Sequence, residues 1–304
     1  MVKVGILDAE KPIAGEIIRI LTNHPETEIK TLVSPLNMGR TISSIHHGLI
    51  GESPKNFTDK INLEELDFLI VPEDSKSWKD LIPLLDDYPD LKLVLLPFEN
   101  SGNTQDYEIG LSEINRKALV RGAKKAYLLS PCITPALISL IPLASFLLLN
   151  DDIEIEVSLP SDISNKIDVN AVSSKLLEIL KKKQISFEGK VNLKLEENND
   201  SERISKTVIY LRNSLPIEEI EKIYDQIYDD HNFTFITHNP VTSKEVEGTQ
   251  KVIINLNKEN EDNLIINIIA DPRMRGGAGD AVHIMNLLFG LHEKTGLTLK
   301  SSRY

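Results

Sequence analysis

The chain has 304 residues, a length that favours two domains, and 41% of them are hydrophobic, which is enough for a packed core. Because 46 acidic residues outnumber 34 basic ones, the net charge of −12 argues against a nucleic-acid partner. The single cysteine excludes an intramolecular disulfide and a cysteine-based metal cluster. No signal-like segment and no apolar run of 18 residues occurs, so we expect a cytoplasmic protein without a membrane span.

The first part of the chain alternates short β-branched runs with helical periodicity, a pattern typical of βαβ units on a parallel sheet. The helices expected between these runs are residues 14–24 and 77–87, and an apolar helix is expected after Cys132, to about residue 149. The expected strands are residues 2–7, 28–33, 67–71, 91–96 and 126–129. This part therefore predicts an α/β domain with a Rossmann-like parallel sheet.

After residue 152 the pattern changes to strands with fewer helices, which indicates an α+β second domain with a mixed sheet. The expected helices are residues 168–183 and 215–230, and a glycine-led amphipathic helix is expected over 276–297. The expected strands are residues 153–159, 190–196, 206–212, 233–236, 251–257 and 264–270.

Several strings along the chain carry a family resemblance. They are GILDAEKPIAGEIIRILTNHPETEI, IHHGLIGE, IGLSEINRKAL, IPLASFLLLN and GGAGDAVHIMNLLFGLHEKTGL. Together they resemble N-acetyl-gamma-glutamyl-phosphate reductase, of the semialdehyde dehydrogenase superfamily, from the first residues to the last. The resemblance implies an NAD(P)-binding-type domain over residues 1–131, completed by a C-terminal helix within 277–304. It implies an α+β catalytic and dimerisation-type domain over 132–276.

The resemblance also implies an activity. Family members use NADPH to reduce an acyl phosphate to a semialdehyde in arginine biosynthesis. A cysteine thiolate attacks the acyl phosphate, a histidine of the second domain moves protons, and arginines hold the substrate. The implied cofactor is NADP and the implied partner a small-molecule acyl phosphate. A homo-oligomer is expected by the same resemblance, or a mixed oligomer with an active paralogue; neither nucleic acid, a membrane nor a metal is implied.

The turn after the first strand differs from a dinucleotide-binding turn, in which glycines let the backbone approach the diphosphate. Here only Gly15 persists, and Ala9 and Lys11 add Cβ atoms where glycine would permit positive φ. Asp8 and Glu10 add carboxylates, and one like-charge pair at about 4 Å costs about 4 kcal/mol at an effective dielectric of 20. The turn is compatible with a plain helix start and with a reshaped nucleotide loop.

Three segments supply candidate cofactor residues by resemblance: this turn, the loop after the second strand, and the glycine turn before the C-terminal helix. A serine and a basic residue in the second segment match positions that hold the ribose 2′-phosphate, although a Ser-Pro turn explains the same letters. The third segment also joins the two domains, so packing explains it equally. The candidates are Lys11, Pro12, Ile13, Ser34, Arg40, Gly277, Gly279 and Asn286.

The nucleophile position reads Ser130-Pro131-Cys132, where the family has Asn-Pro-Gly-Cys. A helix N-terminus lowers the pKa of a thiol and favours the thiolate, whereas a cysteine buried among apolar residues is inert. Cys132 is therefore the candidate nucleophile by position, with a buried structural cysteine as the alternative.

The remaining machinery is altered. Helix 168–183 has no histidine, and Asn170 to Val172 stand where one is expected; the seven histidines of the chain lie elsewhere. Arg203 is the candidate substrate residue, or a solvated loop charge. Residues 97–101 replace an Asp-Arg element of the family. Two functions stay open: an NADP-dependent reductase of an acyl phosphate, and a catalytically silent relative that acts as a binding or regulatory partner subunit.

Overall fold

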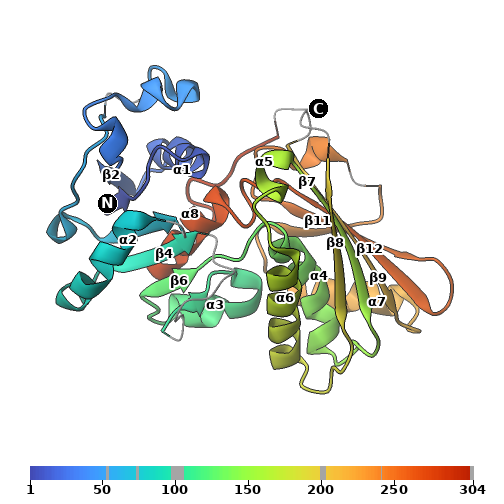
Figure 1. The fold of residues 1–304 in the computed structure, drawn as a ribbon. Helices are drawn as coiled ribbons and strands as arrows, with labels where there is room; N and C mark the ends of the chain where they lie inside the picture. Colours follow the sequence, from blue (N-terminus) through green and yellow to red (C-terminus); the bar gives the residue numbers. More distant parts are fainter. Residues whose placement is uncertain (53–54, 73–74, 97–105, 199–202, 241, 302–304) are drawn as a thin grey trace. The chain divides into compact units, whose positions relative to one another are not determined.

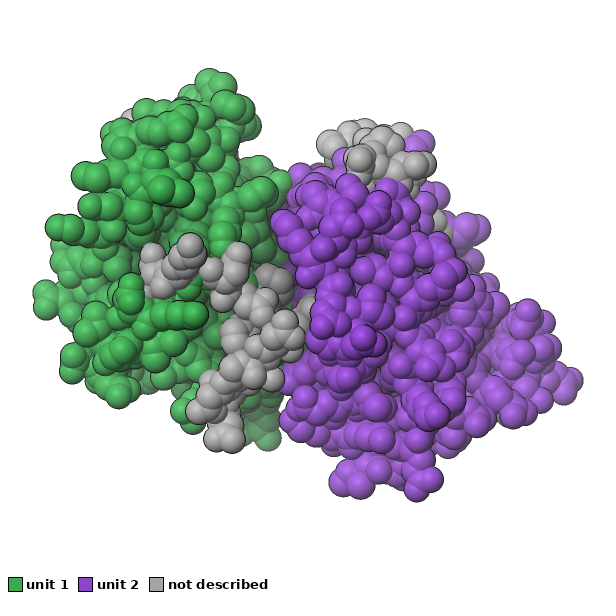
Figure 2. All heavy atoms as spheres, viewed as in Figure 1, with its two compact units in different colours: residues 1–129, 277–298 green, residues 130–276, 299–304 purple. Residues whose placement is uncertain are grey.

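The computed structural model describes the whole chain except residues 53–54, 73–74, 97–105, 199–202, 241 and 302–304. The described residues form two compact units, coloured green and purple in Figure 2. Unit 1 contains residues 1–129 and 277–298, and unit 2 contains residues 130–276 and 299–304. The first division falls two residues before the boundary expected from the sequence, and residues 299–301 group with unit 2, not with the C-terminal helix.

Unit 1 is built on a six-stranded, all-parallel sheet in the order β2-β1-β3-β4-β6-β5 (Figure 1). Its central strands are buried on both faces, as expected for a parallel sheet covered by helices. The strands are β1 (Val2–Ile6), β2 (Thr27–Leu32), β3 (Phe68–Pro72), β4 (Lys92–Leu96), β5 (Glu108–Ile109) and β6 (Lys125–Tyr127). The predicted parallel-sheet domain is confirmed.

Helices α1 (Pro12–Thr22) and α3 (Ser112–Val120) both pack against α8 (Ala278–Leu288), whose residues are all buried. The apolar run of α1 supplies Ile17, Ile18 and Leu21 to this core. Shorter helices follow the other strands: α2 (Lys76–Leu81), η1 (Pro35–Asn37), η2 (Ile42–Ser44), η3 (His47–Leu49), η4 (Leu63–Glu65) and η5 (Ile82–Asp87). The carboxyl ends of β1 and β2 lie side by side because these strands pair in parallel.

Unit 2 has a mixed six-stranded sheet in the order β10-β11-β12-β9-β7-β8. The β7–β8 and β10–β11 pairs are parallel and the other pairs antiparallel. The strands are β7 (Ile153–Leu159), β8 (Val191–Glu197), β9 (Ser205–Arg212), β10 (Thr234–Thr237), β11 (Val252–Lys258) and β12 (Asn263–Ala270). The predicted mixed-sheet second domain is confirmed.

Three helices cover one face of this sheet: α4 (Ile133–Ser145), α6 (Val169–Lys183) and α7 (Ile217–Tyr228), as Figure 1 shows for α4 and α6. The helix α4 is the buried centre, and the hydroxyl groups of Tyr224 and Tyr228 on α7 donate to its carbonyl groups. Two single-turn elements complete the unit, α5 (Ser161–Ser164) and η6 (Ser243–Glu245). No helix among the described residues is both long and apolar enough to cross a membrane.

Two helices end earlier than the sequence predicts. The helix α8 stops at Leu288, not near residue 297, because Gly290 adopts φ +66° and the Leu291 N–H donates to the Asn286 carbonyl. The helix α4 stops at Ser145, not near 149, because Leu147 adopts φ +59° and turns the chain. Periodicity continues past both ends, so it could not mark them.

Candidate functional site

The turn between β1 and α1 keeps a left-handed residue, which is Asp8 at φ +45°. Neither Ala9 nor Lys11 adopts positive φ: Lys11 has φ −67°, and the only other non-glycine residue with positive φ in the described chain is Leu147. Aspartate tolerates this region better than most residues, which explains how the turn forms without glycine. The Lys11 ammonium pairs with the Asp8 carboxylate at 3.2 Å.

The first turn of α1 has backbone N–H groups without a side-chain cap. Pro12 occupies the first helical position, the N-cap Lys11 makes no side-chain cap, and the first turn has no acidic residue. The first helical hydrogen bond runs from Gly15 N to the Lys11 carbonyl, and in the described chain the N–H groups of Ile13 and Ala14 have no partner. Unpaired N–H groups at a helix N-terminus bind phosphate well. Lys11, Pro12 and Ile13 therefore lie together at the start of α1.

One residue near this turn was missed by the sequence reasoning. His46, from the loop after β2, donates from Nε2 to the Ala9 carbonyl at 2.7 Å. Its ring covers Gly15 so closely that a Cβ there would lie 2.5 Å from His46 Nδ1. This contact explains why Gly15 is a glycine, and no pattern in the sequence indicates the pairing. Glu10, in the same turn, has a carboxylate oxygen, Oε2, that is buried without a hydrogen-bond partner among the described residues.

The loop after β2 links Ser34 to Arg40 through a third residue, Asn37. The Asn37 amide donates from Nδ2 to Ser34 Oγ at 3.0 Å, and Arg40 Nη1 donates to Asn37 Oδ1 at 3.1 Å. Ser34 is 0% exposed, whereas Arg40 is exposed. The structure thus brings both sequence candidates into one hydrogen-bonded chain, at the strand end next to the α1 turn.

The third candidate segment lies at the start of α8. Gly277 is the N-cap of α8, and Gly279 is buried in its first turn. Asn286 is buried and donates from Nδ2 to the carbonyls of Glu293, at 3.2 Å, and Thr295, at 2.9 Å. These bonds hold the segment after α8 in place. A packing role therefore accounts for Asn286, and its contact with a cofactor stays a prediction.

His24 completes this arrangement. It is 4% exposed, its Nδ1 accepts from the Glu26 N–H, and its Nε2 lies 3.0 Å from Asn286 Oδ1. Because Nδ1 is an acceptor, Nε2 carries the proton and the ring is neutral. Burial lowers the pKa of His24 below its usual value, although the hydrogen bond to Asn286 acts in the opposite direction.

In unit 2, Cys132 is 0% exposed and lies in a helical turn that begins before α4. The Ser130 carbonyl accepts from the N–H groups of Ile133, at 3.1 Å, and Thr134, at 3.0 Å, so Ser130 caps this turn. Gly276, at φ +74°, packs against it: a Cβ there would lie 2.4 Å from Pro131 N. Position therefore agrees with a nucleophile, and burial agrees with a structural cysteine.

The first turn of α6 has no side chain that could act as the general base for Cys132. The N-cap Asp168 accepts from the N–H groups of Asn170 and Ala171, and Val172 is buried in the core. The two histidines of unit 2 have other partners, since the ring of His231 packs on Tyr228 and His238 pairs with Glu221 at 3.1 Å. In unit 1, His283 pairs with Glu293.

Arg203 is connected to the Cys132 turn through a buried carboxylate. Its Nε donates to Asp271 Oδ2 at 2.9 Å, and Asp271 also accepts from the N–H groups of Gly248 and Arg273. Burial raises the pKa of Asp271, although Arg203 acts in the opposite direction. The Asp271 turn leads directly to Gly276, which packs on Pro131. Arg203 and Cys132 thus belong to neighbouring turns of unit 2.

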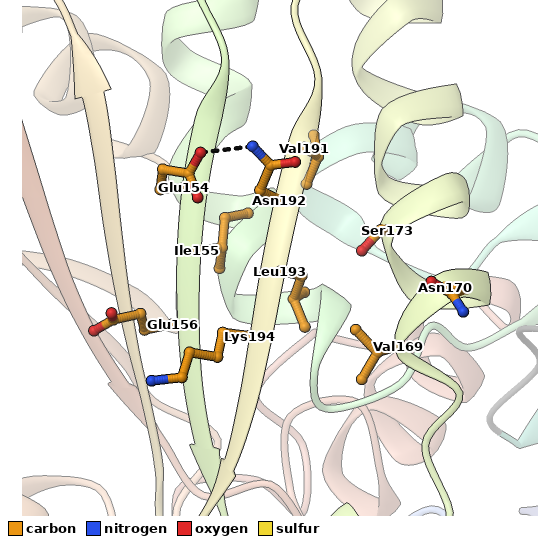
Figure 3. A pocket seen from close by; sticks show the side chains of 10 residues that line it. All are labelled: Glu154, Ile155, Glu156, Val169, Asn170, Ser173, Val191, Asn192, Leu193 and Lys194. Atoms are coloured by element: carbon orange, nitrogen blue, oxygen red, sulfur yellow. Dashed lines mark hydrogen bonds between the residues drawn. The ribbon is translucent and has the colours of Figure 1, made fainter.

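A cavity of about 380 Å³ in unit 2 lies elsewhere, between the start of α6 and the edge strand β8 (Figure 3). Asn170 and Ser173 of α6 line it together with residues of β7 and β8, and none of the predicted site residues does. The Glu154 and Lys194 side chains lie on the other side of the strands from α6 (Figure 3). Residues 97–101 are outside the described chain, and no cluster that could hold a metal occurs within it.

Comparison with known proteins gives a consistent result. The chain is 32% identical to N-acetyl-gamma-glutamyl-phosphate reductase of Parabacteroides distasonis and 33% identical to that of Azobacteroides pseudotrichonymphae, each over 100% of both chains. Aspartate semialdehyde dehydrogenase II of Vibrio cholerae, solved with ASA, shares the fold at a TM-score of 0.68 and 13% identity, over 95% of this chain and 98% of that chain.

Aspartate semialdehyde dehydrogenase of Candida albicans, solved with NADP, shares the fold at a TM-score of 0.66 and 12% identity, over 95% of this chain and 98% of that chain. No family model matches the sequence. The solved structures establish the fold, and the curated relatives establish the family.

Proposed function

The chain belongs to the N-acetyl-gamma-glutamyl-phosphate reductase family, and we propose that it binds NADP(H) in unit 1 but does not catalyse the reduction. It then acts as a non-catalytic binding subunit. The observation that carries this proposal is the first turn of α6, where Asn170, Ala171 and Val172 stand in place of the family's histidine. A thiol needs a base within hydrogen-bond reach to act as a nucleophile.

Cofactor binding is supported by two adjacent loops of unit 1. The open N-terminus of α1 fits a diphosphate, and the loop with Asn37 and Arg40 fits a ribose 2′-phosphate. Lys11 offsets the Asp8 charge, which leaves Glu10 as the carboxylate that opposes binding. NADPH would supply a hydride, and these residues would only bind and orient it.

Loss of catalysis is supported by the burial of Cys132, because reactive cysteines are partly exposed, whereas buried structural cysteines are inert. Ile133, Leu137 and Ile138 of α4 are all 0% exposed as well. Without the histidine, neither thiolate formation nor protonation of the product has a side chain assigned to it.

The test measures binding and turnover on the same protein. We expect NADPH at about 100 times its dissociation constant to raise the free energy of unfolding by about 2.7 kcal/mol. We expect no NADPH oxidation with N-acetyl-gamma-glutamyl phosphate, and the same result for Cys132→Ser. If NADPH leaves unfolding unchanged, cofactor binding is wrong.

An active reductase is the second candidate, and the position of Cys132 in the first turn before α4 favours it. A helix N-terminus stabilises a thiolate. Oxidation of NADPH by the acyl phosphate that disappears in Cys132→Ser would support this candidate and exclude the silent subunit.

Unit 2 supports self-association. The face of its sheet opposite α4, α6 and α7 carries partly exposed aromatic side chains, with Tyr210 38% exposed and Phe235 44% exposed. Val208, Ile253 and Ile265 alternate with buried neighbours and so point to the same face. We infer a symmetric dimer formed through this face.

A further inference from the structure

His46 extends from the loop after β2 to the turn between β1 and α1 and contacts that turn at two points. Its Nε2 donates to the Ala9 carbonyl, and the Nδ1 side of its ring lies against Gly15. We propose that His46 is the positioning residue of the cofactor turn, and that position 15 is a glycine to admit its ring. This inference rests on the proposed NADP(H) binding. It accounts for a turn that binds a diphosphate without the glycines usual in dinucleotide-binding turns.

The Ala9 carbonyl determines whether the first N–H groups of α1 are available to a ligand. It lies four residues before Ile13, so it is the acceptor that the Ile13 N–H would use if the helix began one turn earlier. In the structure this carbonyl accepts from His46 Nε2 at 2.7 Å, and α1 begins at Pro12. Among the described residues, no hydrogen bond joins the Ile13 N–H to Ala9. His46 thereby keeps the Ile13 N–H available for a phosphate oxygen.

Buried residues fix the position of the His46 ring. Its backbone N–H donates to the Ile42 carbonyl at 2.9 Å, and Ile42 is 1% exposed. The ring makes an edge contact with Phe57, also 1% exposed, at 6.2 Å between ring centroids. Because a carbonyl only accepts, the Ala9 contact requires a proton on Nε2. The ring is therefore oriented before any ligand arrives, which lowers the entropic cost of binding.

Gly15 has no conformational reason to be a glycine. It lies within α1, and the glycines with positive φ do not include it. Glycine also lowers the stability of a helix interior relative to alanine. The three atoms nearest to a Cβ at this position all belong to the His46 ring, with Nδ1 at 2.5 Å and Cε1 at 2.9 Å. Gly15→Ala would therefore push the ring away from the Ala9 carbonyl.

The experiment measures the dissociation constant of NADPH by calorimetry on the full chain, with circular dichroism to show that each variant is folded. His46→Ala should weaken NADPH by about tenfold, the equivalent of one hydrogen bond to a charged group, because the Ile13 N–H can then pair with the Ala9 carbonyl. His46→Gln should stay within about threefold of wild type, since its amide can donate to the same carbonyl. A role in folding alone would lower the stability of both variants and leave both dissociation constants unchanged.

Gly15→Ala shows whether the ring or the cofactor requires the glycine. In the wild-type background it should weaken NADPH about as much as His46→Ala does, because it displaces the ring. In the His46→Ala background it should add a loss of less than about twofold, since no ring remains to be displaced. An equal additional loss in both backgrounds would show that the cofactor itself needs the glycine, and would overturn the pairing.

His47→Ala is the matched control, since His47 is exposed and its Nδ1 lies 3.2 Å from the Ser43 carbonyl of its own loop. It should leave the dissociation constant within about twofold of wild type. An unchanged constant in folded His46→Ala would overturn the role of His46 while NADPH binding stands. If His46→Ala does not fold, His46→Leu, which fills the space without a donor, decides the same question. Wild type that does not bind NADPH would overturn both this role and the proposed cofactor.

Discussion

At the scale of single residues, His24 shows how one buried ring is tied to the segment after α8. It bridges the Glu26 N–H and Asn286 Oδ1, and it leaves no space at Gly296, where a Cβ would lie 2.4 Å from His24 Cδ2. The two hydrogen bonds, to the Glu26 N–H and to Asn286 Oδ1, are those that a neutral ring makes. Protonation adds a charge to a site that burial keeps out of water, and would replace the Nδ1 acceptor by a donor facing another donor.

The expected consequence is a pH dependence of stability. Because the pKa of His24 is lowered in the folded state, the unfolded chain binds more protons between that pKa and about 6.5, and stability falls as the pH falls through this window. The slope for one group is at most about 1.4 kcal/mol per pH unit. We expect urea unfolding at pH 7.5 and 5.5 to show a smaller difference for His24→Gln than for wild type. His47→Gln, at an exposed histidine, should match wild type; equal differences in all three proteins would disprove the role of His24.

At the scale of elements, two glycines of unit 2 share a backbone conformation but differ in surroundings. Gly276 has φ +74° and Gly248 has φ +73°. A Cβ at Gly248 meets nothing within 4 Å, whereas one at Gly276 meets the backbone of the Cys132 turn. Gly248→Ala should therefore cost only the left-handed conformation, about 1 kcal/mol. We expect Gly276→Ala to lower the free energy of unfolding by about 2 kcal/mol more, because the backbone of Gly276 and that of the Cys132 turn would have to move apart to make room for the Cβ. Urea unfolding of the two variants measures this difference. Equal losses of stability would show that the backbone around Gly276 can accommodate a Cβ.

The same elements show what periodicity could and could not predict. Strands such as β7 and helices such as α6 lie within one or two residues of their expected bounds, since alternation and helical spacing report the buried face directly. The two-residue strand β5 was not expected, because so short a segment has no period. The ends of α4 and α8 depend on single left-handed residues, which an apolar pattern does not reveal.

The site was less predictable than the fold, because its chemistry depends on exposure and long-range contacts. The sequence pointed to Ser34 and Arg40, but the burial of Ser34 and the bridging role of Asn37 needed the folded loop. The pairing of His46 with Ala9 spans 37 residues and has no local signal. The missing histidine of α6, by contrast, was visible directly in the sequence.

At the scale of the whole molecule, the open face of the unit 2 sheet is the face opposite the one that α4, α6 and α7 cover. Its partly exposed apolar residues lie beside charges, with Glu154 and Glu156 on β7 and Arg212 on β9. In a two-fold dimer the same patch supplies both sides, so its apolar residues can pack on the partner's copies, and acidic and basic side chains can pair across the interface. A dimer would therefore remove the exposed apolar surface without requiring another protein.

Ile265 on β12 tests this arrangement, since it lies on the open face between the fully buried Leu264 and Ile266. We expect wild type to be dimeric by light scattering, and Ile265→Glu to dissociate it, because each dimer would then bury two unpaired carboxylates. At about 3 kcal/mol or more for an unpaired buried charge, the dissociation constant should rise at least a hundredfold. Ile185→Glu makes the same replacement at a residue that is 90% exposed outside this face, and should stay dimeric. Circular dichroism should show both variants folded; a folded Ile265→Glu that remains dimeric would place the interface elsewhere, and a monomeric wild type would exclude the dimer.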